Sequence, residues 1–186
     1  MFSLPKKIFV GLSSFFFAIC SILIISESVS FSFHGFGIDS ADRLYIGTGH
    51  KISVYEGKTE INTITTGTSR GFYFTIQRDD TILLSTSTHV YILDLQGSLI
   101  KEITQDIERT HGRIKDGRFR FQTASGDLYI ASRPFGRLTI HQGDDVVFKM
   151  PLLDYVTMLL TFISAPCFLL SIWLTKRYNK RQGMLP

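Results

Sequence analysis

The residues that could bind a metal ion or serve as acid and base are scattered along this 186-residue chain. Its five histidines form no His-x-x-x-His pair of the kind that holds zinc. Asp79-Asp80 and Asp144-Asp145 are adjacent carboxylates, whereas a calcium loop needs oxygen ligands at alternating positions. Motifs for a nucleophilic serine or a nucleotide phosphate loop are absent. The sequence therefore predicts no catalytic, cofactor-binding or metal-binding residue, and we expect the protein not to be an enzyme.

A cluster of cations between residues 109 and 120 is the most distinctive local feature. Six basic or titratable side chains accompany one acid, Asp116, and they form a candidate patch for an anion or a partner: Arg109, His111, Arg113, Lys115, Arg118 and Arg120. Such a patch would attract phosphate headgroups, an anionic cell-wall polymer or an acidic protein. In the alternative interpretation, Arg118 and Arg120 are the solvent face of a strand whose inner face carries Phe119 and Phe121.

Two long uncharged segments indicate how these residues are held in place. Residues 8–26 and 155–175 contain no Asp, Glu, Lys or Arg. About 20 apolar residues at 1.5 Å per residue cover the hydrocarbon core of a bilayer, so both segments predict transmembrane helices. The alternative for the first segment is a signal peptide cleaved near Phe31, although its apolar run exceeds the usual 7–15 or so residues. Cys20 and Cys167 both lie in these segments, so no disulfide is expected outside the membrane.

The distribution of charge predicts the orientation. Lysine and arginine flank the outer ends of both segments, within residues 1–7 and 176–186, and basic flanks stay in the cytoplasm. Residues 27–154 contain sixteen acids and fourteen Lys or Arg residues, and we expect this region outside the cell. The protein is thus predicted to be a multi-pass plasma-membrane protein in contact with the lipid bilayer. The net charge of +4 follows from this topology and predicts no nucleic-acid partner.

The region between the segments repeats itself three times. Similar strand patterns begin at Arg43, Thr81 and Asp127, which are 38 and 46 residues apart. Each unit continues with a second strand, a Gly-containing turn and a third strand, and each is preceded by a further strand within residues 32–38, 71–76 or 118–122. The pattern predicts four short antiparallel strands per unit. The basic segment accounts for the longer second spacing.

A polar turn leads into Leu-Tyr-Ile in the first and third units, and a Val-Tyr strand follows in the first and second. This pattern resembles the repeats of NHL-like β-propellers over residues 31–150. The resemblance implies blades of four strands arranged around an axis. The expected fold is an all-β extracytoplasmic domain, built as a partial propeller of three units, between two transmembrane helices. A β-sandwich is the alternative.

Three units are fewer than the four to eight or so blades of closed propellers. A partial propeller exposes apolar faces and strand edges, so we expect a homo-oligomer or a membrane-protein partner, unless membrane-proximal segments cover the open faces. The predicted function is that of a non-enzymatic, membrane-anchored interaction or sensory module. The alternative is a surface enzyme or substrate-binding subunit acting on an extracellular polymer.

Overall fold

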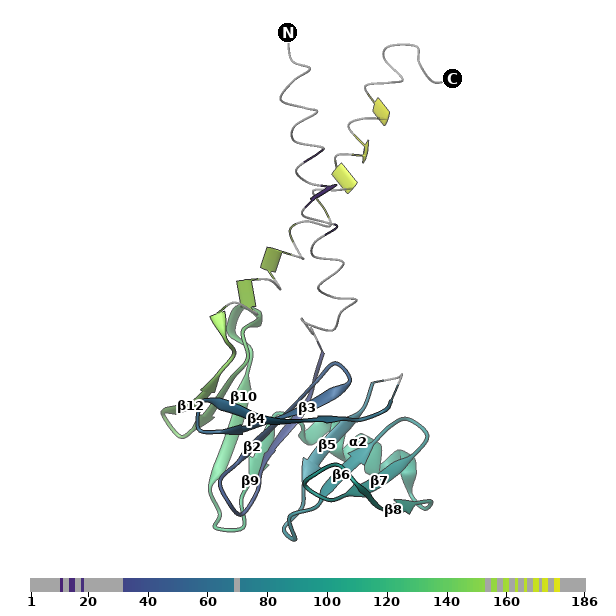
Figure 1. The fold of residues 1–186 in the computed structure, drawn as a ribbon, viewed down its shortest axis with the longest axis vertical. Coiled ribbons are helices and arrows are strands. Elements are labelled where there is room, and N and C mark those ends of the chain that lie inside the picture. The colour runs from purple at the N-terminus through teal and green to yellow at the C-terminus, as the bar shows by residue number, and fades with distance from the viewer. Residues whose placement is uncertain are drawn as a thin grey trace. The chain divides into compact units, whose positions relative to one another are not determined.

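The computed structural model describes residues 32–68 and 71–152, together with isolated positions between 11 and 18 and between 155 and 177. The chain divides into two compact units, residues 31–150 and residues 1–30 with 151–186 (Figure 1). The predicted spans, 8–26 and 155–175, belong to the second unit, and most of their residues lie outside the described part of the chain. Within the described residues, no helix has the length and apolar character needed to cross a membrane. The two spans therefore stay a prediction.

Residues 31–150 form three four-stranded antiparallel sheets, each a meander in chain order. Sheet A contains β1 (Phe33–Ile38), β2 (Leu44–Thr48), β3 (Lys51–Glu56) and β4 (Thr59–Thr65). Sheet B contains β5 (Tyr73–Ile76), β6 (Ile82–Ser85), β7 (Val90–Leu93) and β8 (Leu99–Ile103). Sheet C contains β9 (Arg120–Gln122), β10 (Leu128–Ser132), β11 (Thr139–Gln142) and β12 (Asp145–Lys149). The predicted three units of four strands are confirmed, and the described strands form three sheets and not a two-sheet sandwich.

Equivalent turns have equivalent backbone conformations. The turn between the first two strands of each sheet has one residue with positive φ, and this residue is Asp42, Asp80 or Gly126. The turn between the last two strands has its positive φ at Gly57, Gly97 or Gly143. Glycine adopts this region without the steric cost that a Cβ brings, and Asp tolerates it better than most residues. The periodicity of the sequence is therefore a periodicity of backbone geometry.

Sheet A lies between the other two sheets, although it comes first in the chain (Figure 1). Its face with Tyr45, Ile52 and Val54 packs on sheet B, where Phe74, Ile82 and Leu84 are buried. Its opposite face packs on sheet C through a second cluster: Phe33, Phe36, Ile38, Leu44 and Ile46 with Tyr129, Ala131, Leu138 and Ile140. The spatial order is thus B–A–C.

All three sheets stack in the same sense. Tyr45, Leu83 and Tyr129 occupy equivalent positions in β2, β6 and β10, and they contact sheet B, a helix and sheet A, respectively. The neighbouring positions point the opposite way, so Ile82 contacts sheet A while Leu128 lies on the surface. In a closed ring the Leu83 face of sheet B would meet the Leu128 face of sheet C. No such closed ring is formed by the described sheets.

The segment between sheets B and C differs from its prediction. An all-β region was expected, but residues Ile107–Gly117 form helix α2, and a short 3-10 turn follows at Pro134–Gly136. The strand expected at 118–122 begins only at Arg120, and Arg118 lies in the preceding turn. Ile107 and Ile114 share one side of the helix and pack against sheet B, where they cover Leu83 and Val90. This burial stabilises a helix in a segment otherwise rich in polar residues.

Candidate functional site

Helix α2 attaches to sheet B through polar and aromatic contacts as well as its isoleucines. The Nδ1 atom of His111 lies 3.0 Å from the hydroxyl oxygen of Ser85 in β6. The same imidazole meets the ring of Tyr73 edge-on, with the ring centroids 5.3 Å apart. His111 was predicted as part of the basic patch, but these contacts give it a structural role between the helix and the sheet.

Arg118 is held at the end of α2. Its Nη1 donates a hydrogen bond to the carbonyl oxygen of Lys115. Its guanidinium carbon lies 4.6 Å from the centroid of the Phe119 ring and 5.5 Å from that of Tyr73, within the range of cation–π attraction. The orientation of Arg118 is therefore restricted by three neighbours.

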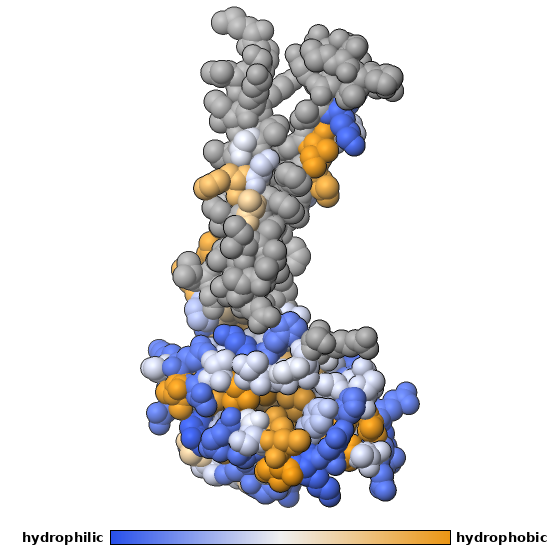
Figure 2. Space-filling model, turned by 45° about the vertical axis from the view of Figure 1, so that its right-hand side comes forward, coloured by the Kyte–Doolittle hydropathy of each residue, from blue (hydrophilic) through white to orange (hydrophobic). Residues whose placement is uncertain are grey.

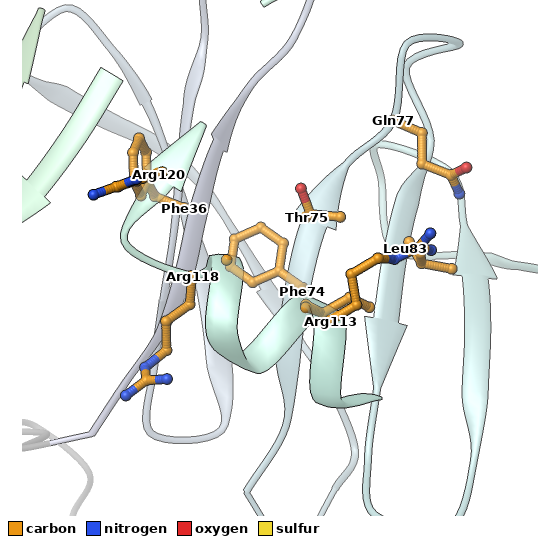
Figure 3. A pocket seen from close by; sticks show the side chains of 10 residues that line it. Phe36, Phe74, Thr75, Gln77, Leu83, Arg113, Arg118 and Arg120 are labelled. Carbon is orange, nitrogen blue, oxygen red and sulfur yellow. The ribbon is translucent and has the colours of Figure 1, made fainter. Parts of the chain in front are cut away.

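A cavity of about 270 Å³ opens beside α2. Its walls come from α2, sheet B, β1 and the start of sheet C: Phe36, Phe74, Thr75, Gln77, Leu83, Arg113, Ile114, Gly117, Arg118 and Arg120. Figure 3 shows the ring of Phe74 at the centre, with Arg113 extending toward Leu83 below the amide of Gln77. The side chains of Arg118 and Arg120 lie on the other side of Phe74, and their guanidinium groups point away from it (Figure 3).

The structure thus brings together half of the predicted patch. Arg113, Arg118 and Arg120 line the cavity, whereas Arg109, His111 and Lys115 do not. No carboxylate is among the lining residues, so the positive field of the three guanidinium groups is not neutralised within the walls. Because the guanidinium groups point in different directions, they suit an extended anionic surface better than one small anion bound by all three.

His34 in β1 lies next to this region and is buried as a neutral side chain. Its ring lies 4.6 Å from the ring of Phe72, centroid to centroid. Burial lowers the pKa of His34 below its usual value, and the positive fields of His50 and Arg118 lower it further. The imidazole therefore adds no charge near the cavity at neutral pH.

The other histidines each have a local contact. His50 Nδ1 lies 2.8 Å from the carbonyl oxygen of Thr68, and His141 Nε2 lies 3.2 Å from the hydroxyl of Thr139. His89 stacks on Tyr91 and lies 3.9 Å from a carboxylate oxygen of Glu102. Over the described part of the chain, His, Cys, Asp and Glu form no group of three suited to a metal ion.

Sequence reasoning did not single out Asp39, which is the buried acid of the first turn. Its carboxylate accepts hydrogen bonds from the backbone N–H groups of Ala41 and Arg43, at 3.0 and 2.9 Å, and from the hydroxyl of Tyr45 at 3.1 Å. The guanidinium of Arg43 approaches it to 2.7 Å. Burial, together with the charge of Asp39, raises the pKa of Tyr45. These bonds occupy the carboxylate, so Asp39 stabilises the turn. The sequence signal that could have identified this ion pair is the position of Asp39 four residues before Arg43.

Comparisons with known proteins identify no relative of assigned function. No protein-family model matches the chain, and neither does any curated protein. One similar solved structure is a crystal structure of a protein of unknown function from Bacteroides caccae, with 11% sequence identity and a TM-score of 0.31. The match covers 65% of this chain and 46% of that one, so this chain spans less than half of its length. A similarity of this size supports no inference about fold or function.

Proposed function

We propose that this protein is a non-enzymatic interaction or sensory module, anchored in the plasma membrane by residues 8–26 and 155–175. Its three-sheet domain, related in this proposal to NHL-like propeller repeats, lies outside the cell. The uncharged segments and their basic flanks support the anchoring. The stacking of the sheets in one sense supports the relation to propellers.

The observation that carries the proposal is the arginine-lined cavity beside α2. Residues 27–154 contain more acids than Lys and Arg, yet Arg113, Arg118 and Arg120 line a cavity with no carboxylate among its described lining residues. The lining also includes the apolar side chains of Phe36, Phe74 and Ile114. A surface that combines apolar side chains with cations is suited to recognising an anionic partner.

The cavity favours binding over catalysis on an extracellular polymer. Hydrolysis of a glycosidic bond uses two carboxyl groups that flank the bond. The lining residues of the cavity include neither Asp nor Glu. The buried Asp39 is already bonded to three neighbouring residues.

Purification of the full chain from its native membranes tests the function. Chemical cross-linking before extraction in mild detergent, followed by mass spectrometry, should reveal a second protein in stoichiometric amount. Arg113→Gln should reduce its recovery, because the substitution removes a cation from the cavity. Arg78→Gln is the matched control, since Arg78 is exposed on a turn of sheet B and does not line the cavity. A cross-linked sample containing only this chain would contradict the proposal, and turnover of a surface polymer would favour an enzyme.

A further inference from the structure

The outer face of sheet C carries exposed apolar side chains. Along β10, Tyr129 and Ala131 are buried against sheet A, while the alternate residues Leu128 and Ile130 point outward and are 47% and 43% exposed. Val146 in the edge strand β12 is 55% exposed. The side of sheet B that faces away from sheet A differs, because α2 covers Leu83 and Val90 there. Figure 2 shows that apolar residues lie in small groups among polar ones on one side of this domain.

The register of the strands places cations beside these apolar side chains. Arg120 in β9 is the partner of Ile130, and Ile130 is also opposite His141 in β11. His141 in turn is opposite Val146, and Lys149 is opposite Thr139. Partners across antiparallel strands point to the same side of a sheet. The outer face therefore carries this set: Arg120, Gln122, Leu128, Ile130, Ser132, Thr139, His141, Val146 and Lys149.

The charges of this face determine what can cover it. Arg120 and Lys149 are exposed, and no carboxylate is among the residues that the register assigns to the face. A second copy packed face to face would bring together two cationic faces, neither of which supplies a carboxylate from the residues that the register assigns to it, and this is unfavourable. A segment with carboxylates between apolar side chains would be complementary to both the apolar side chains and the cations of this face.

We propose that the outer face of sheet C binds a partner protein through an acidic segment in which apolar and acidic residues alternate. The apolar side chains cover Leu128, Ile130 and Val146, and the carboxylates pair with Arg120 and Lys149. This inference rests on the proposed function and names the partner chemistry. Arg120 also lines the α2 cavity, so the bound segment reaches the edge of the candidate site.

Two synthetic peptides test the proposal on the full chain in neutral detergent. One alternates Val and Glu over nine residues, and the other alternates Val and Lys. Fluorescence anisotropy should show at least tenfold tighter binding of the Glu peptide, with an affinity that falls as salt rises. Arg120→Glu combined with Lys149→Glu should reverse the preference. Ile130→Ser should weaken binding of the Glu peptide about tenfold, since it removes an apolar contact.

Ile100→Ser is the matched control, because Ile100 is an exposed isoleucine on the edge strand β8 of sheet B. Equal affinity for the two peptides, or an equal effect of Ile100→Ser and Ile130→Ser, would overturn the proposal. A dimer of the chain that Ile130→Ser dissociates would assign the face to a second copy instead. If cross-linking finds a partner attached away from sheet C, the interaction module stands and the acidic-segment site is rejected.

Discussion

The backbone N–H of Ser40 donates a hydrogen bond to Oδ1 of Asp80 at 2.9 Å, and the Ser40 hydroxyl donates to Oδ2 of the same carboxylate. Ser40 lies in the turn between β1 and β2, and Asp80 lies in the corresponding turn of sheet B. The Asp80 carboxylate thus connects the two turns across the boundary between the sheets, through the backbone and the side chain of Ser40. Asp80 also has a positive φ of 58°, so one residue shapes its own turn and bonds to the neighbouring one.

Replacement of Asp80 by Gly should destabilise the domain by about 1 kcal/mol, because two hydrogen bonds to a partly exposed carboxylate are lost. Glycine keeps the backbone conformation, so strain does not contribute. Asp42→Gly is the matched control, since Asp42 has the same conformation, with φ of 59°, at the equivalent turn position. Urea unfolding in detergent, followed by circular dichroism, should give Asp80→Gly a clearly lower free energy of unfolding than Asp42→Gly. Equal free energies of unfolding would contradict a linking role for Asp80.

Gly37→Ala should be destabilising by about 1–3 kcal/mol through overpacking between sheets A and B. A Cβ atom at Gly37 would lie 2.5 Å from Cγ1 of Ile76 and 3.0 Å from its backbone nitrogen. The comparison is Gly112→Ala in α2, where a Cβ would meet nothing within 4 Å. That change should be stabilising by up to about 1 kcal/mol, because alanine has the higher helix propensity. The same unfolding measurement distinguishes the two variants. Gly37→Ala should lower the free energy of unfolding and Gly112→Ala should raise it.

The strands could be predicted because local sequence determines them. Alternation of apolar and polar residues predicted the strands β2, β6 and β10. Gly57, Gly97 and Gly143 indicated the turns, and all three have positive φ in the structure. The order B–A–C could not be predicted, since it depends on contacts between sheets that are distant in sequence. The exposed Leu128 and the buried Ile82 are equivalent in the repeat, and only the stacking distinguishes them.

Helix α2 was missed because its apolar signal is weak. Ile107 and Ile114 are seven residues apart, and the residues between them are polar except for Gly112. A seven-residue separation puts both on one side of a helix, but two residues are a small pattern. The contacts with Leu83 and Val90 supply the missing stabilisation, and no local sequence rule reports them. The patch was consequently predicted as one surface, although only Arg113, Arg118 and Arg120 meet at the cavity.

The stability of the domain should decrease as the pH falls below about 6.5, the usual pKa of histidine in an unfolded chain. Burial lowers the pKa of His34 in the folded state, so the unfolded state binds the proton more readily. The contribution of neutral His34 is therefore present above about 6.5 and is lost as the pH falls through the lowered pKa. His34→Gln should reduce the difference in unfolding free energy between pH 7.5 and pH 5. His89→Gln, which removes a surface histidine stacked on Tyr91, should leave the difference close to that of the wild type.

The topology of the chain provides the last prediction. The basic flanks predict that both ends are cytoplasmic, so a reporter fused after Pro186 should be active only inside the cell. Ser98→Cys, in a variant whose Cys20 and Cys167 are replaced by alanine, should react with a membrane-impermeant maleimide on intact cells. Ser98 suits this test, because its side chain is exposed at the turn before β8 while its backbone N–H is bonded to Asp94 at 2.7 Å. A cysteine in place of Asn179 should react only after permeabilisation, which controls for leaky cells. If the reporter is active outside, or if the cysteine at position 98 is protected, the two-span model and the extracytoplasmic site of the interaction module are both wrong.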